Sequence, residues 1–272
     1  MSRELPGPAW LFCPADRPER YAKAADRSDV VILDLEDAVA GADKQSARDA
    51  LVATPLDPER TVVRINGVDT EHHAADLEAL RSTAYTRVML PKCEGAHQVR
   101  SLELLEVVAL VESPLGVLAV EEIAKADNTV GIMWGAEDLV AGLGGSSSRR
   151  ADGVYRGVAQ HARSMTLLAA KGHGRWALDS VYLDIKDTDG LHDETLDAVA
   201  VGFDVKVAIH PGQIEPIRRA YLPTPEEVDW ARRVLAAAEN ERGVFDFEGA
   251  MVDGPILEHA ERLLQRSSMH RT

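Results

Sequence analysis

Residues 107–138 read VVALVESPLGVLAVEEIAKADNTVGIMWGAED, and this stretch decides the fold. Its two apolar runs, 107–111 and 129–134, have the length and the Val, Ile and Leu content of buried parallel strands. A helix-length segment separates them, which is the pattern of a β/α unit. Glu112 follows the first run directly and Asp138 follows the second shortly after its end. Because the ends of successive parallel strands lie side by side on the ligand-binding face, the two carboxylates are expected to converge.

Two converging carboxylates predict a site for a hard cation. Mg²⁺ is the expected cofactor, because it takes a few carboxylates together with waters and substrate oxygens. The sequence therefore predicts Glu112 and Asp138 as metal ligands. It contains neither HExxH nor a Cys/His zinc spacing, and its two cysteines, Cys13 and Cys93, form no CxxC motif.

The same alternation of strand and helix patterns runs through most of the chain. Eight short apolar runs are expected as strands: 9–14, 29–35, 61–66, 87–91, 107–112, 129–134, 177–183 and 204–210. Amphipathic stretches follow them: 20–27, 44–54, 74–82, 115–126, 155–170, 193–201 and 214–221. Eight β/α units in 272 residues predict a closed (β/α)₈ TIM barrel. An open doubly wound sheet is the alternative, but it usually has fewer strands, and no GxGxxG follows the first run.

The pattern ends at Pro223-Thr224-Pro225, beyond which two more helices are expected at 225–242 and 255–268. We therefore predict a barrel over residues 1–222 and a C-terminal helical extension over 223–272. The extension either caps the barrel or contacts a neighbouring subunit. Residues 144–150, GGSSSRR, form the most loop-like internal stretch, and a mobile active-site flap and a plain surface linker are both open readings.

Composition narrows the classes of partner. A formal net charge of −15 argues against nucleic acid and anionic membranes as main partners. It leaves room for a small anionic ligand held by local basic residues. No apolar run approaches membrane-spanning length, no signal-peptide pattern opens the chain, and two cysteines fit a reducing compartment. A cytoplasmic location is therefore expected.

Polar residues gather where the expected strands end. Arg64 interrupts an apolar run, and burying a guanidinium is expensive unless it is paired. We favour a role as a fixed cation for a substrate carboxylate or enolate oxygen, with a buried salt bridge to Asp34 or Glu36 as the alternative. Glu36 itself either orients Arg64 or contacts metal-bound water. Arg17 and Lys23 flank the first strand-to-helix turn, where basic residues suit phosphate groups.

In this order, the strand-end motifs resemble the citrate lyase β-subunit-like branch of the HpcH/HpaI aldolase superfamily over nearly the whole chain. The motifs are LFCPADRPER (11–20), VILDLEDAV (31–39), VRIN (63–66), LPK (90–92), Glu112, GAEDL (135–139) and AIHP (208–211). The resemblance implies a Mg²⁺-dependent carbon–carbon lyase on a TIM barrel, usually a homotrimer. It implies Glu112 and Asp138 as metal ligands and Arg64 as the residue that contacts the substrate and its developing enolate.

The resemblance also implies roles outside the metal site. CoA-binding members hold the nucleotide with basic residues near the first turn, which matches Arg17 and Lys23. They carry an Asp in the C-terminal tail that enters the neighbour's active site, and MVDGPIL (251–257) is similar to that segment. Asp253 is therefore the expected catalytic acid/base. The alternative for Asp253 is a helix N-cap before Pro255.

The expected reaction is reversible cleavage of a β-hydroxyacyl-CoA thioester of citramalyl, malyl or citryl type. Two other functions stay open. One is a CoA-independent pyruvate aldolase of the same superfamily, against which the tail and the basic first turn argue. The other is a non-catalytic subunit of a lyase complex whose acyl group arrives on a carrier protein, although no carrier-like segment occurs in the chain.

Overall fold

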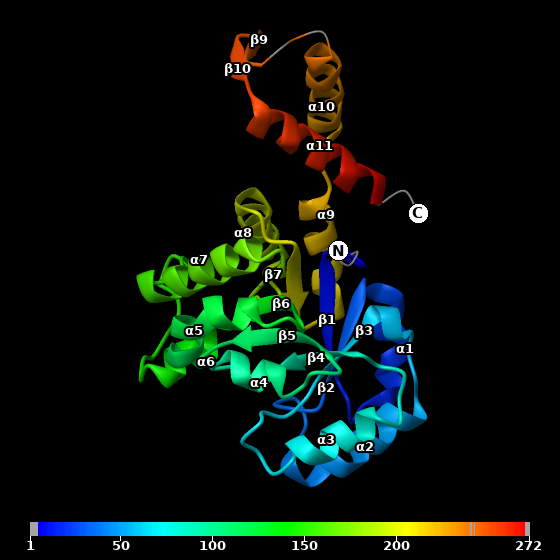
Figure 1. The fold of residues 1–272 in the computed structure, drawn as a ribbon. Helices are drawn as coiled ribbons and strands as arrows, with labels where there is room; N and C mark the ends of the chain where they lie inside the picture. Colours follow the sequence, from blue (N-terminus) through cyan, green and yellow to red (C-terminus); the bar gives the residue numbers. More distant parts are fainter. Residues whose placement is uncertain (1–4, 240, 242, 270–272) are drawn as a thin grey trace. The chain divides into compact units, whose positions relative to one another are not determined.

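A closed barrel of eight parallel strands forms the centre of the fold in the computed structural model, which describes residues 5–239, 241 and 243–269 (Figure 1). The strands follow one another around the barrel in chain order, and β1 closes it by pairing Trp10 with Val207 of β8. The predicted TIM barrel is thus confirmed. The strands are β1 (Ala9–Pro14), β2 (Val30–Asp34), β3 (Thr61–Arg64), β4 (Arg87–Leu90), β5 (Glu106–Val111), β6 (Thr129–Trp134), β7 (Trp176–Asp179) and β8 (Val205–Ala208).

Helices alternate with the strands and surround them in Figure 1. At the start of α5, Ser113 accepts a hydrogen bond from Gly116 N and Pro114 occupies the first helical position. This N-cap ends β5 at the point where Glu112 leaves the strand. The helices that follow the strands are α1 (Tyr21–Arg27), α2 (Lys44–Ala53), α3 (His73–Leu80), α4 (Ala96–Arg100), α5 (Pro114–Lys125), α6 (Ala136–Gly142), α7 (Gly157–Gly172), α8 (Thr188–Val201) and α9 (Ile214–Tyr221).

The barrel interior is filled by large apolar side chains. Trp10 and Trp176 meet edge to face with ring centroids 6.1 Å apart. Interior residues alternate along the strands, as with Val30 and Ile32 in β2. The next residue with the same alternation in β2 is Asp34, so the interior turns from apolar to charged at the carboxyl ends of the strands. We call this end of the barrel the mouth.

The chain divides into two compact units, of which one ends at Ile217 and the other begins at Arg218. The sequence placed this division five residues later, after residue 222. The second unit contains α10 (Pro225–Ala238), the hairpin of β9 (Phe245–Phe247) with β10 (Ala250–Val252), and α11 (Gly254–Met269). It has its own small core, made by Ala231, Val234, Val252, Ala260 and Leu263. The periodicity predicted α10 to residue 242; residues 240 and 242 lie outside the described part of the chain.

Candidate active site

Arg64 and Asp34 form a paired charge at the barrel mouth. They are partners in the register of β2 and β3. Arg64 donates from Nε to Asp34 Oδ1 at 2.8 Å and from Nη2 to Oδ2 at 2.6 Å, and its guanidinium lies 4.7 Å from the Phe12 ring centre. Its Nη1 lies 2.9 Å from Glu36 Oε2. The salt bridges that the sequence offered as the alternative reading of Arg64 are therefore present.

These contacts leave Arg64 equipped to bind a ligand as well. Burial alone would lower the pKa of Arg64, but its bonds to Asp34 and the charge of Glu36 outweigh burial and raise it, so the cation is permanent. A guanidinium carries five N–H donors, and Arg64 donates from Nε and Nη2 to Asp34. Its Nη1 is ion-paired with Glu36 without a hydrogen bond, since Glu36 Oε2 has no hydrogen-bond partner among the described residues. N–H groups on Nη1 and Nη2 therefore remain available on a side chain held in place by two carboxylates. The structural and the substrate-binding readings of Arg64 are thus compatible.

Lys92 is a mouth residue that the sequence analysis did not select. Its Nζ donates to Glu36 Oε1 at 2.5 Å, and its backbone N donates to Glu112 Oε1 at 3.0 Å. Its backbone φ is +48°, a conformation that a residue with a side chain adopts at a cost and mostly at functional positions. The available signal was its place directly after Pro91 at a strand end. Lys92 thereby links Glu36 to Glu112.

Glu112 and Asp138 form the predicted metal pair. Glu112 is 4% exposed, and burial, followed by the negative charges of Asp138 and Glu36, raises its pKa to about 8. Asp138 lies exposed in the first turn of α6, and within the described residues its carboxylate has no hydrogen-bond partner. A bound cation would offset the repulsion between Glu112 and Asp138, so this pair fits the chemistry of a cation site.

The local geometry fits a small divalent ion. Gly135 lies beside Glu112, and a Cβ there would come within 2.9 Å of Glu112 Oε2, so only glycine leaves this oxygen free. No cluster of three or more Asp, Glu, His or Cys suited to a metal occurs in the described part of the chain. Two carboxylates match Mg²⁺, which keeps several waters and substrate oxygens as its other ligands.

A buried lysine holds the strand ends that carry these groups. Lys44 Nζ donates to Leu35 O, Glu36 O and Asn66 Oδ1 at 2.6–2.8 Å. Its three donors are all satisfied, so the ammonium can remain in the interior. Lys44 thereby fixes the backbone on which Glu36 lies, and no sequence pattern indicated this function.

The other predicted binding residues lie outside this cluster. Arg17 is exposed in the connection between β1 and α1, with its Nε 3.6 Å from Asp16 Oδ2, and Lys23 is exposed within α1. Asp253 belongs to the second unit and directly precedes α11. Its backbone O accepts from Leu257 N, whereas its carboxylate has no hydrogen-bond partner among the described residues. The roles of these three residues remain predictions.

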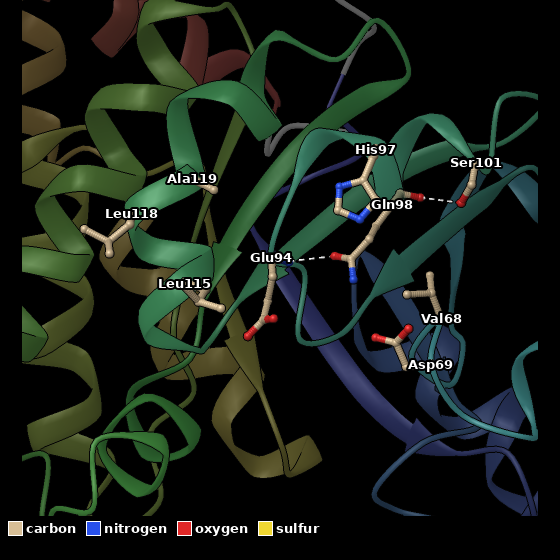
Figure 2. A pocket seen from close by; sticks show the side chains of 9 residues that line it. All are labelled: Val68, Asp69, Glu94, His97, Gln98, Ser101, Leu115, Leu118 and Ala119. Atoms are coloured by element: carbon tan, nitrogen blue, oxygen red, sulfur yellow. Dashed lines mark hydrogen bonds between the residues drawn. The ribbon is translucent and has the colours of Figure 1, made fainter.

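A cavity of about 650 Å³ opens among the segments that follow β3, β4 and β5 (Figure 2). Its apolar wall contains Leu115 and Leu118, and its polar wall contains Asp69, Glu94 and His97. None of the predicted site residues lines it. It is nevertheless adjacent to the site, because Glu94 accepts a 2.6 Å hydrogen bond from Ser113, the residue after Glu112.

The fold and the mouth residues define a TIM-barrel protein whose mouth carries several carboxylates around an arginine held by ion pairs. The HpcH/HpaI aldolase/citrate lyase family model matches residues 9–211, and the chain belongs to this family. A citrate lyase subunit beta-like protein of Mycobacterium tuberculosis (strain ATCC 25618 / H37Rv) is 64% identical over 267 residues, which cover 98% of both chains. The mitochondrial citramalyl-CoA lyase of Mus musculus is 31% identical over 294 residues, covering 96% of this chain and 86% of that protein.

A solved structure shares the whole architecture. The crystal structure of CitE from Mycobacterium tuberculosis in complex with magnesium, acetoacetate and coenzyme A has a TM-score of 0.94 and 64% identity, covering 96% of this chain and 98% of that chain. The magnesium in that complex agrees with the predicted cofactor. Membership of the family confirms the predicted class of enzyme, a carbon–carbon lyase.

Two further predictions are not tested by these comparisons. The expected trimer and the expected cytoplasmic location remain predictions. Among the described residues, every helix is too short or too polar to cross a bilayer.

Proposed function

We propose that this protein is a Mg²⁺-dependent lyase that cleaves or forms a β-hydroxyacyl-CoA thioester of citramalyl, malyl or citryl type. The observation that carries the proposal is the mouth geometry, in which the charge of buried Glu112 interacts both with that of Asp138 and with that of the doubly paired Arg64. The relatives named above support the thioester, since one is a citramalyl-CoA lyase and another was crystallised with coenzyme A.

Glu112 and Asp138 would hold the metal ion. When bound, Mg²⁺ acts as a Lewis acid and template for the carboxylate and neighbouring oxygen of the hydroxy or keto acid. Lys92 holds Glu112 through its backbone N–H, and this hydrogen bond leaves the second carboxylate oxygen of Glu112 available. Gly135 keeps space beside that oxygen.

Arg64 would stabilise the charge that develops as the carbon–carbon bond breaks. In the cleavage direction a base accepts the β-hydroxyl proton, the carbonyl of the departing keto acid forms as the carbon–carbon bond breaks, and the electrons of that bond remain on the acyl thioester as an enolate. The free N–H groups of Arg64 are fixed by Asp34 before the reaction begins, so they need no reorganisation to meet this negative oxygen. Asp34 is thus a positioning residue for Arg64.

Asp253 would act as the acid and base that transfers a proton to and from the α-carbon of the acyl thioester. It donates a proton to the enolate carbon in cleavage, and it removes a methyl proton from acetyl-CoA in condensation. Arg17 and Lys23 would pair with the phosphates of the CoA moiety, for which exposed cations near a helix start are suited.

The test is a comparison of substrates with the purified protein alone. Citramalyl-, malyl- and citryl-CoA would be supplied with Mg²⁺ and, in parallel, with excess EDTA, and acetyl-CoA release would be followed together with pyruvate, glyoxylate or oxaloacetate. We expect Mg²⁺-dependent cleavage of at least one thioester. Cleavage of only a free hydroxy-keto acid would favour the pyruvate aldolase instead, and activity only with a carrier-bound acyl group would favour the lyase-complex subunit.

A further inference from the structure

The connection between α6 and α7, residues 143–156, is held in a defined conformation. It includes the stretch 144–150 that the sequence left open as a flap or a linker. Arg149 and Tyr155 form an antiparallel bridge, Arg150 N donates to Val154 O at 2.9 Å, and Arg156 N donates to Ser148 O at 2.8 Å. This pairing folds the segment back on itself, and we call it the 143–156 loop.

Ser148 attaches the loop to the turn that carries Asp138. It is 2% exposed although its neighbours in the sequence are largely open to solvent. Its Oγ donates to Glu137 Oε1 at 2.6 Å. Glu137 is the residue before Asp138 in the first turn of α6. Because Asp138 has no hydrogen-bond partner in the described residues, its position depends on contacts of this kind made by its neighbours.

Arg149 attaches the loop to α8. Its Nη1 donates to Glu194 Oε2 at 2.6 Å and to Gly153 O at 2.9 Å. Its guanidinium lies 3.6 Å from the Tyr155 ring centre, within the range of a cation–π contact. The side chain is thus fixed in two directions, by an ion pair and by an aromatic face.

A buried charge network continues from this ion pair to β6. Lys206 has no exposed surface and donates to Glu194 Oε1 at 2.8 Å and to Asp179 Oδ2 at 2.9 Å. Asp179 Oδ1 accepts from Trp134 Nε1 at 2.7 Å, and the Trp134 ring meets Tyr155 edge to face at 5.1 Å. A chain of contacts therefore connects Arg149 with Trp134, the last residue of β6.

Two sets of contacts consequently meet in the segment that leads to Asp138. Trp134 is fixed at the end of β6, and Glu137 is fixed in the first turn of α6, directly before Asp138. Burying an ammonium among carboxylates is expensive unless its geometry is fully satisfied, and such networks contribute specificity of position more than net stability. Here the position that the network specifies is the turn that carries a metal ligand.

We propose that Ser148 and Arg149 are positioning residues that hold the first turn of α6, and with it Asp138, in the geometry that binds the divalent cation. This inference rests on the proposed function, because it takes Asp138 as a metal ligand. Neither residue is required to touch the substrate. Outer contacts that orient metal ligands typically change metal affinity 10–100-fold when they are removed.

The test compares two variants with matched neighbours in the same loop. Ser148→Ala and Arg149→Met remove the two attachments, whereas Ser146→Ala and Arg150→Met alter exposed side chains. Affinity for Mg²⁺ and Mn²⁺ would be measured by isothermal titration calorimetry without substrate, beside the thermal midpoint of each protein. We expect about 10-fold weaker metal binding in both attachment variants and unchanged binding in both controls.

The outcomes separate this inference from the proposed function. Wild-type binding with unchanged affinity in Ser148→Ala and Arg149→Met would overturn the positioning function, even if their thermal midpoints fell. Wild-type protein that bound neither ion would overturn the metal site and the inference together. If one variant failed to fold, weakened binding in the other, at a temperature well below its midpoint, would still support the proposal.

Discussion

At the scale of single residues, the position of Glu112 depends on the lack of a side chain at Gly135. Gly135 has ordinary extended dihedral angles, φ −119° and ψ 120°, so an alanine there would meet no backbone strain. Its Cβ would instead lie 2.8 Å from Glu112 Cβ and 2.9 Å from Oε2, too close without movement. The effect of a methyl group at this position is therefore purely steric.

Gly135→Ala is expected to displace Glu112 and weaken Mg²⁺ binding by about 10- to 100-fold. Titration calorimetry measures this affinity directly. Gly157→Ala is the matched control, because a Cβ at Gly157 has nothing within 4 Å and alanine favours the helix that begins there. Equal metal affinity in the two variants would contradict the assignment of Glu112.

Asp138→Ala is expected to abolish Mg²⁺-dependent turnover with little change in thermal stability. The carboxylate is exposed and unpaired in the described structure, and its removal relieves repulsion at Glu112. Thioester cleavage at increasing Mg²⁺ concentration and a thermal melt measure the two effects. Turnover at the wild-type rate would remove Asp138 from the metal site.

Sequence patterns predicted the mouth residues for an identifiable reason. Arg64, Glu112 and Asp138 are charged residues at the ends of apolar runs, and this pattern is visible in the sequence alone. Lys92 and Lys44 act through contacts with groups on other strand ends, and such contacts depend on the fold around them. The place of Lys92 after Pro91 at a strand end was its only signal, and no local pattern distinguishes Lys44 from an exposed lysine.

At the scale of elements, strands were predicted better than short helices. The runs 9–14 and 129–134 match β1 and β6 to the residue. The run 177–183 was too long, because β7 ends at Asp179 although the apolar residues continue. The helices α4 and α6 were missed, since five and seven residues span at most two turns and show no clear periodicity.

The buried ion pair between β7 and β8 gives the pH dependence of stability. Burial alone would raise the pKa of Asp179, but Lys206 and Arg163 outweigh it and hold the pKa at about 2, against an ordinary value of 3.8. A depressed carboxyl pKa contributes stability that is present above the unfolded value and is lost as pH falls through the folded value. At 1.36 kcal/mol per unit, the contribution is about 2 kcal/mol.

Asp179→Asn should therefore lower the free energy of unfolding by about 2 kcal/mol at neutral pH, and the difference from wild type should shrink between about pH 4 and pH 2. Urea unfolding at pH 7, 5, 4 and 3 measures this. Asp197→Asn is the control, because Asp197 also pairs with Arg163 but is 61% exposed. A difference that stayed constant over this pH range would show that the charge of Asp179 is not what stabilises the native state.

At the scale of the whole molecule, the predicted metal ligands belong to the barrel unit, and Asp253 belongs to the second unit. The sequence predicted both parts, because Pro223-Thr224-Pro225 interrupts the β/α alternation. It did not predict the hairpin of β9 and β10, whose three-residue strands flank the left-handed Glu248 and Gly249. Asp253 directly follows this hairpin, so the hairpin determines the backbone position from which its side chain extends.

Because Asp253 and the predicted metal ligands belong to different units of the chain, their proposed roles can be tested by complementation. Asp253→Asn is expected to bind Mg²⁺ like the wild type yet to lose exchange of the acetyl-CoA methyl protons with D₂O, because the metal ligands are intact and the base is absent. Asp138→Ala should also lose this exchange, because its base is intact and a metal ligand is absent. If Asp253 serves the active site of a neighbouring subunit, subunits of the two variants that are mixed, unfolded and refolded together will form some complete sites. Exchange should then reappear in the mixture and in neither variant alone, whereas an inactive mixture of correctly assembled oligomers would place both residues in the site of one subunit.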